Sequence, residues 1–305
     1  MIARHQQGMT GSAPGILCIG SVLWDIIGTT HVRMHAGADV PGRIRRRPGG
    51  VALNIALALA GHGLRPAVLT AIGLDASGDE LIASATQSGI DCTHAFRSSR
   101  PTDCYMAIEA PSGVVAAIAD AHSLEAAGED ILAPLADGRL GRAEAPWTGP
   151  IVIDGNLTEA LLGGIAQSPL FRQADVRVVT ASPGKADRLR PMLGVPNATL
   201  YVNLEEAGIL CGGHFATAEE GAAALMARGV RRVFVTNGPE PVAEGWEGRG
   251  IIVASPPPVV PARLTGAGDR FMATHLAAEL AGASRADALA RGLRAAARFV
   301  EGEPD

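Results

Sequence analysis

The sequence predicts an α/β protein in which helices cover both faces of a mostly parallel central β-sheet, with a small second β-sheet beside it. The central sheet is predicted by short runs rich in Val and Ile that recur along the chain, several of them separated by helical stretches. The small sheet is predicted by two segments, 29–47 and 101–118, in which polar and apolar side chains alternate without a helical period.

Composition limits the classes of partner. The 305 residues are 47% hydrophobic, enough for the core of one large α/β domain. A net charge of −5 gives no basic footprint for nucleic acid, and no apolar run is long enough to cross a membrane. The four cysteines lack CxxC spacing, which favours reduced thiols. We therefore expect a cytoplasmic protein with no nucleic-acid or membrane partner.

The elements follow in order. Residues 1–15 are predicted to form a flexible polar tail, and residues 16–305 a single domain. Buried strands are predicted at 16–20, 67–73, 151–155, 176–182, 199–203 and 231–237. Helices are predicted at 50–61, 157–167 and 217–229. The first of these is apolar all round, as expected for a helix packed inside a large domain.

The segments 29–47 and 101–118 are predicted to be antiparallel strands that form a flap, or lid, over one end of the core. The first segment contains a basic run, Arg43, Arg45, Arg46 and Arg47. This run favours a solvated loop, and the alternative is a patch that attracts an anion.

The stretch PARLTGAGDRF, residues 261–271, places three small residues at the start of a long helical pattern. The unpaired N–H groups of a helix N-terminus, preceded by residues without bulk, form a binding site for an anion such as a phosphoryl group. Thr265 adds a hydroxyl, and Asp269 is a carboxylate able to take a proton from an attacking hydroxyl. The alternative is a tight turn at Gly266–Gly268 with Asp269 as a helix cap. GAGDRF lacks the third Gly of a dinucleotide fingerprint, and no Walker A loop occurs.

The stretch PGGVALN, residues 48–54, is a second candidate. Gly49 and Gly50 allow close approach to a ligand, and Asn54 on an apolar helix needs hydrogen-bond partners. Asn54 either points its amide at ligand hydroxyls or is a satisfied core residue. Asp25 follows the first strand at its carboxyl end, where parallel sheets bind ligands.

Together these motifs resemble those of the ribokinase-like (PfkB) family of sugar and nucleoside kinases. Gly49, Gly50 and Asn54 match its early signature, and Gly266–Asp269 its late one. Between them, Asn203 with Glu206 and Thr236 with Gly238 match its N-x-x-E and T-x-G elements. Within the family, GGVALNIA and the segments 102–120, 153–157 and 182–189 look most like the pseudouridine kinase branch.

The resemblance implies a Rossmann-like, three-layer ribokinase fold with a β lid, ATP as the donor and Mg²⁺ bridging the phosphates. A monovalent cation such as K⁺ is left open. Residues implied to bind the substrate are Asp25, Gly49, Gly50, Asn54, Tyr105 and Asn156. Residues implied to serve the nucleotide are Lys185, Asn203, Glu206, Thr236, Gly238 and Thr265. Glu206 is implied to hold the metal through water. Gly266, Ala267 and Gly268 would form the anion hole, and Asp269 would be the base that activates a 5′-hydroxyl.

Alternatives stay open for three of these residues. Lys185 is otherwise a surface lysine, Glu206 a support of its own helix, and Tyr105 a packing residue of the lid. The chain also departs from the family pattern, with Arg263 in place of an Asp and Leu53 in place of an Arg. Arg263 binds phosphate, repositions ATP or marks a weakened enzyme.

The expected activity is therefore phosphorylation of a nucleoside, pseudouridine first. The alternatives are a ribose, fructose or adenosine type of kinase, and a nucleoside- or sugar-binding protein that has lost catalysis. Alternating apolar side chains in the lid also suggest a homodimer in which two lids pair.

Overall fold

The computed structural model describes residues 14–35, 37–263 and 265–302. Residues 1–13 of the predicted tail lie outside this part of the chain. At the end of that predicted tail, the Gly15 N–H donates to the Arg65 carbonyl at 2.9 Å.

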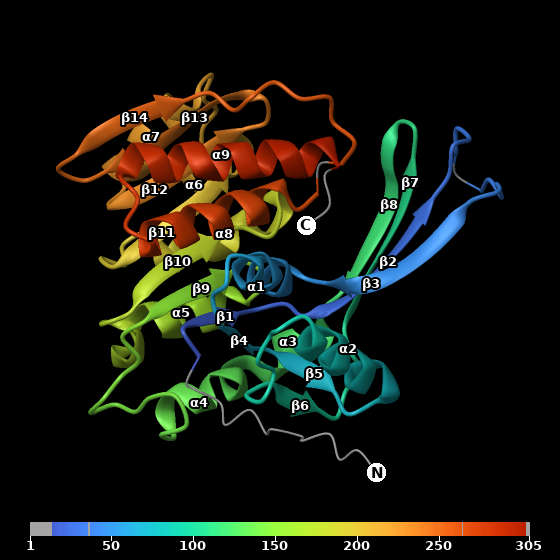
Figure 1. The fold of residues 1–305 in the computed structure, drawn as a ribbon, viewed down its shortest axis with the longest axis horizontal. Helices are drawn as coiled ribbons and strands as arrows, with labels where there is room; N and C mark the ends of the chain where they lie inside the picture. Colours follow the sequence, from blue (N-terminus) through green and yellow to red (C-terminus); the bar gives the residue numbers. More distant parts are fainter. Residues whose placement is uncertain (1–13, 36, 264, 303–305) are drawn as a thin grey trace, which may run out of the picture.

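A large, mostly parallel β-sheet forms the centre of the molecule, as predicted (Figure 1). Its strands are β1 (Ile16–Ile19), β4 (Pro66–Leu69), β9 (Pro150–Asp154), β10 (Asp175–Val179), β11 (Ala198–Asn203), β12 (Arg232–Asn237), β13 (Glu240–Trp246) and β14 (Gly250–Ala254). Among the described residues the order is β14-β13-β12-β11-β10-β9-β1-β4. Neither β13 nor β14 was predicted. Within the described part of the sheet, β13 alone runs against the other strands and pairs antiparallel with both β12 and β14.

The stretch 67–73 was predicted as one strand and is two. The chain turns out of the main sheet at Thr70, whose carbonyl accepts the Phe96 N–H at 2.8 Å. The next residues form β5 (Ala71–Gly73), which pairs with β6 (Phe96–Ser98) in a separate sheet. The prediction failed because one continuous apolar run contains two strands, β4, which pairs with β1, and β5, which pairs with β6.

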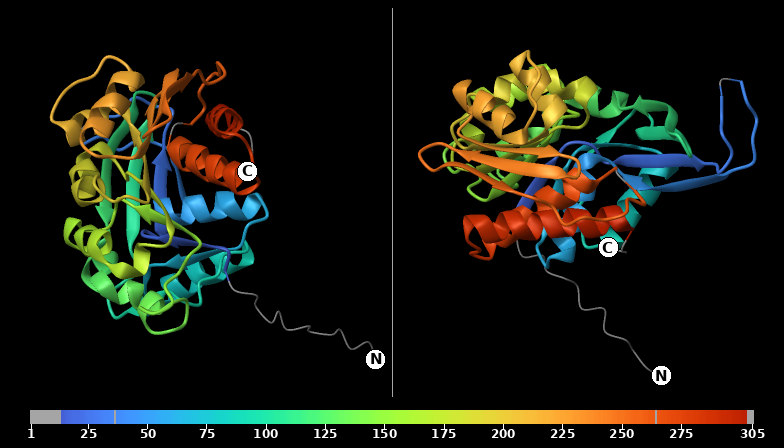
Figure 2. Two further views of the ribbon diagram at one scale, coloured as in Figure 1. Left: turned by 90° about the vertical axis from the view of Figure 1, so that its left-hand side faces the viewer. Right: turned by 90° about the horizontal axis from the view of Figure 1, so that it is seen from above.

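Helices cover both faces of the main sheet (Figure 2). On one face lie α1 (Val51–Gly61), α2 (Ala76–Gln87), α8 (Ala267–Leu280) and α9 (Arg285–Glu301). On the other lie α3 (His122–Ala127), α4 (Ala133–Ala136), α5 (Glu159–Gln167), α6 (Leu204–Cys211) and α7 (Ala218–Ala227). The 3₁₀ helices are η1 (Gly128–Leu132), η2 (Pro169–Phe171) and η3 (Pro183–Met192). Neighbouring strand residues serve opposite faces, so that Ile153 packs in one core and Val152 in the other. No helix in the described ranges is long and apolar enough to span a membrane.

A four-stranded sheet projects from the carboxyl end of the central strands (Figure 1). We call it the small sheet; its strands are β2 (Leu23–Thr29), β3 (Arg43–Gly49), β7 (Cys104–Ala110) and β8 (Gly113–Asp120), in the order β3-β2-β7-β8. It lies where the lid was expected, but its first strand begins at Leu23, before the predicted segment. The prediction of antiparallel strands is partly wrong, because β2 and β7 pair in parallel. A parallel pair joins segments distant in the chain and leaves no local turn signal.

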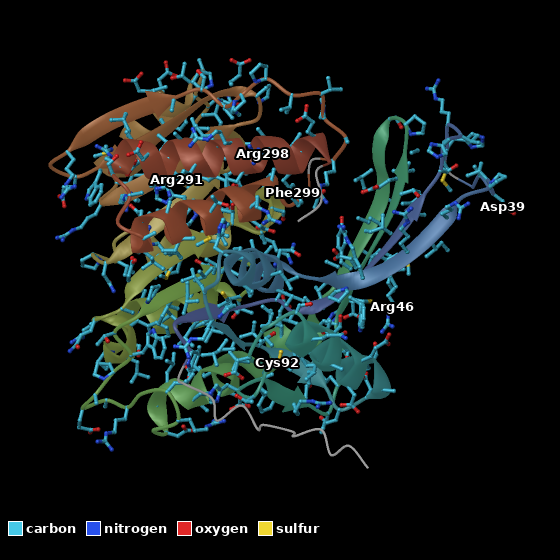
Figure 3. All side chains as sticks on the ribbon, in the orientation of Figure 1. Asp39, Arg46, Cys92, Arg291, Arg298 and Phe299 are labelled. Carbon is cyan, nitrogen blue, oxygen red and sulfur yellow. The ribbon has the colours of Figure 1, made fainter. Side chains whose placement is uncertain are left out.

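The basic run belongs to β3 and is not a solvated loop. Arg46 stacks on Trp24, with its guanidinium carbon 3.6 Å from the ring centroid, and donates to Glu80 at 2.6 Å (Figure 3). Strand alternation turns Arg47 to the opposite face of the sheet, beside Asp25.

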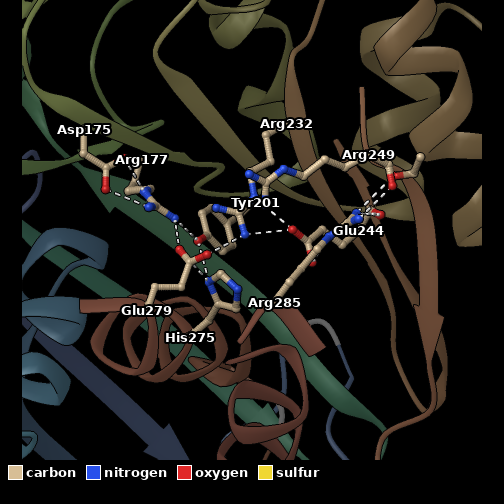
Figure 4. A network of polar contacts seen from close by, with 10 residues as sticks. Asp175, Arg177, Tyr201, Arg232, Glu244, Arg249, His275, Glu279 and Arg285 are labelled. Carbon is tan, nitrogen blue, oxygen red and sulfur yellow. Dashed lines mark hydrogen bonds and ion pairs between the residues drawn. The ribbon is translucent and has the colours of Figure 1, made fainter. Parts of the chain in front are cut away.

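A network of charged side chains lies at the amino end of the parallel strands, between the sheet and α8 (Figure 4). Its members are Asp175, Arg177, Tyr201, Arg232, Glu244, His275, Glu279 and Arg285. Glu279, near the end of α8, accepts from Arg177 at 2.7 Å and from Arg232 at 2.6 Å. Burial opposes ionisation, but the hydrogen bond from Arg232 and the charge of Arg177 lower the pKa of Glu279 to about 2. The network fixes the C-terminal end of α8 to the sheet.

Candidate active site

A cleft of about 660 Å³ lies between the carboxyl end of the main sheet and the inner face of the small sheet. It brings together most of the residues that the sequence singled out, namely Asp25, Gly50, Asn54, Tyr105, Asn156, Lys185, Asn203, Glu206, Thr236, Thr265, Gly266, Gly268 and Asp269. Gly49, Ala267 and Gly238 are not part of its wall. Gly238 is exposed in the turn between β12 and β13, with a positive φ of 56°.

Helix α8 begins at the cleft. Gly266 is its N-cap with φ 94°, a conformation that favours glycine, and an added Cβ would lie 3.0 Å from the Phe299 ring. At Gly268 an added Cβ would meet no atom within 4 Å, so the backbone there borders open space. The first-turn N–H groups of a 14-residue helix therefore face a space large enough for an anion.

Asp269 stands in the first turn of α8 and is only 9% exposed. Its Oδ2 accepts a hydrogen bond from the Asn54 amide on α1 at 3.0 Å. Burial raises the pKa of Asp269 to about 7; the Asn54 hydrogen bond opposes this rise, and the charges of Asp154 and Asp25 add to it. A carboxylate with a pKa near 7 is suited to take up a proton at neutral pH.

Asn54 thus has a partner that the sequence did not reveal. Its amide group is directed at Asp269, 215 residues away in the chain, and fixes the orientation of that carboxylate. Leu53, in place of the family's Arg, is fully buried in the core.

The two glycines before α1 make room for the protein itself. A Cβ at Gly49 would lie 2.4 Å from the Asp25 carboxyl carbon, and one at Gly50 would lie 2.4 Å from the Ser21 carbonyl oxygen. Gly50 also has φ 97°. The groups that approach these glycines are therefore the Asp25 side chain on β2 and the loop between β1 and β2. The expected approach of a ligand stays a prediction.

Asp25 lies on β2 of the small sheet, not at the end of β1 as expected. An Arg47 nitrogen lies 3.6 Å from its carboxylate, and both residues line the cleft. Burial raises the pKa of Asp25, and the charge of Arg47 lowers it. The sequence singled out Arg47 only as part of the basic run and not as a residue of the site. The two-residue alternation of a strand was the signal that placed it apart from Arg46.

Asn203 and Glu206 form a capping box at the start of α6. The Asn203 side chain accepts the Glu206 N–H at 2.8 Å, and the Glu206 carboxylate accepts the Asn203 N–H at 2.7 Å. Thr180, another residue that the sequence reading missed, donates to the same carboxylate at 2.5 Å. Burial raises the pKa of Glu206. Glu206 supports its own helix and also lines the cleft, so both readings of this residue fit the structure.

Lys185 is half-buried in the wall of the cleft and is not a surface lysine. Its Nζ donates to the Asn156 side-chain oxygen at 2.6 Å. The Asn156 amide in turn donates to Asp154 at 2.9 Å and to Ser21 at 3.1 Å. Sequence reasoning named neither Ser21 nor Asp154. Ser21 follows β1 and Asp154 is the last residue of β9, so both lie at the carboxyl end of the parallel strands.

Tyr105, Thr236 and Thr265 complete the cleft wall. Tyr105 lies on the inner face of the small sheet, where burial raises the pKa of its hydroxyl, and Asp25 adds to that effect. Thr236, the last residue but one of β12, makes a weak 3.5 Å contact with the Val202 carbonyl. Thr265 precedes α8 and is exposed.

Arg263 does not line the cleft. Its Nε donates to the Phe299 carbonyl at 2.7 Å, and its guanidinium lies 3.6 Å above the Phe299 ring, near the end of α9 (Figure 3). The same ring supports Gly266. Arg263 therefore anchors the segment before α8 to the last helix, a role that the sequence did not suggest.

The donor set bears on which cofactors fit. The N–H groups at the start of α8, with Lys185 across the cleft, suit an anion such as a nucleotide phosphate. Within the described residues no three His, Cys, Asp or Glu side chains gather as a metal site. Mg²⁺ fits this arrangement when nucleotide phosphates and water supply most of its ligands, with Glu206 reached through water.

Comparisons with known proteins agree with this geometry. The family model for pfkB family carbohydrate kinases matches residues 13–303. An uncharacterized sugar kinase of Escherichia coli K12, YeiI, is 31% identical over 222 residues, which cover 71% of this chain and 59% of that protein. The pseudouridine kinase of the same organism is 37% identical over 75 residues, 25% of this chain and 24% of that protein. The match thus spans less than two thirds of the length of either curated relative.

The fold has solved counterparts. The structure of Arabidopsis thaliana ribokinase complexed with ribose and ATP matches with a TM-score of 0.76 at 19% identity, covering 96% of this chain and 94% of that one. This likeness establishes a ribokinase-like fold.

Proposed function

Because the chain belongs to the pfkB family of carbohydrate kinases, we propose that it catalyses ATP-dependent phosphoryl transfer to a hydroxyl of a small sugar-type substrate. The observation that carries the proposal is the pairing, at the start of α8, of an open N–H site with Asp269, a carboxylate whose pKa is raised to about 7. Asp269 can accept the proton of the attacking hydroxyl, and the N–H groups can stabilise the negative charge on the transferred phosphoryl group. Phosphoryl transfer requires both.

In the proposed reaction the substrate hydroxyl oxygen attacks the γ-phosphorus, and the bond from that phosphorus to the bridging oxygen of ADP breaks. Asp269 takes the proton of the hydroxyl, with Asn54 holding its carboxylate in place. Gly266–Gly268 present N–H groups to the charge that develops on the transferred group. Mg²⁺, when bound with the nucleotide, would neutralise phosphate charge.

The remaining roles follow from position in the cleft. Lys185, Asn203, Glu206, Thr236 and Thr265 are proposed to serve the nucleotide, with Gly238 in the exposed turn beside it. Asp25 and Tyr105, on the small sheet, are proposed to contact the substrate. A monovalent cation such as K⁺ is proposed as a further cofactor, and the dependence of the rate on K⁺ concentration is the test.

For the acceptor we propose the 5′-hydroxyl of a nucleoside, with pseudouridine first. The support is the local identity to E. coli pseudouridine kinase over 75 residues. A ribose, fructose or adenosine acceptor is the alternative, because the longer match is to a sugar kinase. A nucleoside- or sugar-binding protein that has lost catalysis was suggested by Arg263 and by the altered flanks of the motifs. Arg263 is anchored on Phe299 outside the cleft, which weakens the first of these two reasons.

The test is ADP release from Mg-ATP by purified protein with pseudouridine, uridine, adenosine, ribose and fructose, each against a no-acceptor control. Release with pseudouridine alone supports the full proposal. Release with a sugar supports the reaction and replaces the acceptor. If no acceptor stimulates ADP release while calorimetry still detects binding of one of them, the proposed reaction is contradicted for these acceptors.

We further propose that two small sheets pair in a homodimer through their outer faces. On that face Ile26, Met106 and Ile118 form a cross-strand row, and Met106 and Ile118 are 46% and 70% exposed. Sedimentation should show a dimer that Ile118→Asp dissociates. A monomer at high concentration of the unaltered protein would reject the pairing.

A further inference from the structure

Asp154, at the end of β9, is a buried carboxylate with no role so far assigned. It is fully buried, and its side chain occupies space that exists because residue 20 is glycine. A Cβ on Gly20 would lie 2.3 Å from the Asp154 Cβ. Its neighbours Ser21 and Asn156 line the cleft, whereas Asp154 itself does not. A carboxylate buried in this way requires hydrogen-bond partners.

Four hydrogen bonds reach Asp154, all of them donated to it. The Ser21 N–H and hydroxyl donate to Oδ2 at 2.8 and 2.5 Å. The Asn156 N–H and amide donate to Oδ1 at 2.7 and 2.9 Å. The Ser21 oxygen already accepts from the Val51 N–H and from the Asn156 amide, so its own proton is directed at Asp154. Burial raises the pKa of Asp154, and these donors oppose the rise. All four hydrogen bonds leave Asp154 as an acceptor, the arrangement that favours its charged form.

This carboxylate fixes which way the Asn156 amide points. The NH₂ group faces the acceptors Asp154 and Ser21, and the oxygen faces the Lys185 ammonium at 2.6 Å. A flipped amide would place its NH₂ against the ammonium and its oxygen against the carboxylate, with no hydrogen bond on either side. The Asn156 oxygen accepts the hydrogen bond from Lys185, and Asp154 sets the direction in which that oxygen points.

A second connection runs from Asp154 to the other end of the cleft. The Ser21 hydroxyl oxygen accepts the Val51 N–H at 2.9 Å and so caps the first turn of α1. One turn later on α1, Asn54 donates to Asp269. The cap holds the helix that orients the proposed base.

We propose that Asp154 is a positioning residue for both halves of the transfer, directing Lys185 to the nucleotide phosphates through Asn156 and orienting Asp269 through Ser21 and α1. The inference rests on the proposed function for these two end points. The hydrogen-bonded connections themselves do not depend on it, and the experiments below separate the two.

The first experiment requires no catalysis. The rate at which an amine reagent labels Lys185 is followed against pH by mass spectrometry in the unliganded protein, for the unaltered chain, Asp154→Asn and Asn156→Leu. The charges around Lys185 are Asp154 below it, Glu125 on α3 and Arg188 on η3; burial and Arg188 lower its pKa, while Asp154 and Glu125 raise it. Removing the negative charge of Asp154 should shift the labelling midpoint to lower pH.

Asp103→Asn is the matched control. Asp103 is also a buried carboxylate, 4% exposed, that caps a helix by accepting the Ser123 and Leu124 N–H groups. No contact links it to Lys185 among the described residues. Its variant should leave the labelling midpoint unchanged. An unchanged midpoint in both Asp154→Asn and Asn156→Leu overturns the proposal; if Asp154→Asn does not fold, Asn156→Leu decides alone.

The second experiment uses steady-state kinetics to separate the connection to Lys185 from the connection to Asp269. The acceptor is the one identified by the ADP-release test above. Asn156→Leu should raise KM for ATP about tenfold, the equivalent of one hydrogen bond to a charged group, with a smaller effect on kcat. Ser21→Ala should lower kcat with little change in KM for ATP. Asp154→Asn should show both effects. Equal losses in all variants, in step with their thermal unfolding, would indicate a purely structural carboxylate. A protein without kinase activity would refute the function, while the labelling result would still stand.

Discussion

Helix α8 carries a buried carboxylate, Asp269, at its start and a partly buried one, Glu279, near its end, and their pKa values are shifted in opposite directions. At the start, burial raises the pKa of Asp269 to about 7, with one neutral amide as its hydrogen-bond partner. Near the end, Glu279 lies between two arginines, which lower its pKa to about 2. Burial raises the pKa of both carboxylates, so burial alone does not explain the opposite shifts; the pairing of Glu279 with two arginines does. We therefore expect Glu279, which is paired with arginines, to contribute to stability, and Asp269, which has no cationic partner among its pKa determinants, to contribute to the reaction.

The largest expected effect comes from removing the charge at the reactive end. Asp269→Asn should abolish most turnover, by ~10² fold or more, while substrate binding survives. The same variant should unfold at a higher temperature at pH 7. The unfolded carboxyl ionises near pH 4 and the folded one near 7, so folding loses stability as pH rises between them, about 1.4 kcal/mol per unit at most.

Thermal unfolding at pH 5 and 8 and ADP release together check this prediction. The gain in stability from Asp269→Asn should be larger at pH 8 than at pH 5. A variant that is less stable than the unaltered chain at pH 8, or that keeps full turnover, would contradict the assignment of an uncompensated carboxylate to this site.

The opposite outcome is expected at the other end of α8. Glu279→Gln removes the charge that Arg177 and Arg232 share, while Asp175 and Glu244 still pair with them, and should destabilise the fold by about 1.5–3 kcal/mol in denaturant unfolding. Turnover at a temperature where the variant is folded should change little. Because its pKa is lowered, the stabilisation by Glu279 is present above about pH 4.5 and lost as pH falls toward 2.

Glu247→Gln is the control for that variant. Glu247 pairs with Arg231 at 3.3 Å, but both side chains are more than half exposed. Its loss should cost about 0.5 kcal/mol or less. Equal costs for the two variants would show that the network of Figure 4 is not the stabilising element that its geometry implies.

A smaller effect separates the two glycines at the start of α8. Gly266→Ala meets a positive φ and the Phe299 ring, and should destabilise the fold by about 1–3 kcal/mol. Gly268→Ala meets neither, so stability should hold or rise by up to about 1 kcal/mol. Its methyl group nevertheless enters the proposed anion site and should lower turnover. Full turnover in Gly268→Ala would place the phosphoryl group elsewhere.

The smallest expected effect is a shift in pH dependence. The rate kcat/KM should rise with pH and level off above about 7, as Asp269 of the free enzyme loses its proton. Asn54→Leu removes the hydrogen bond that stabilises the carboxylate, so the midpoint should move up by about one unit. A midpoint that stays in place would show that another group controls the acid limb.

The sequence predicted the central sheet because its strands are buried on both faces, which gives the Val- and Ile-rich runs a local signature. It predicted the α8 site for a related reason, since bare backbone before a helix is visible in neighbouring residues. Both features can be recognised from residues that are close together in the sequence.

What it missed depends on register between distant segments. Asn54 meets Asp269 across 215 residues, and Arg47 faces the cleft only because of its pairing with Asp25. Asp154 and Ser21 meet at the ends of neighbouring strands, 133 residues apart. Single residues carry no spacing signal, so only the assembled sheet shows which of them converge.

The parallel pairing of β2 with β7 has a consequence for the order of folding. Trp24 pairs with Cys104, and the segment between them contains α1, β4 and α2. Closing that long loop costs entropy before any of its contacts form, so the small sheet should assemble after the core that the intervening segment joins. Its strands should also open first in the native state, and amide hydrogens of β2 and β7 should exchange faster than those of β9 and β10. The small sheet, which carries the proposed substrate contacts Asp25 and Tyr105, would then open more readily than the core beneath it.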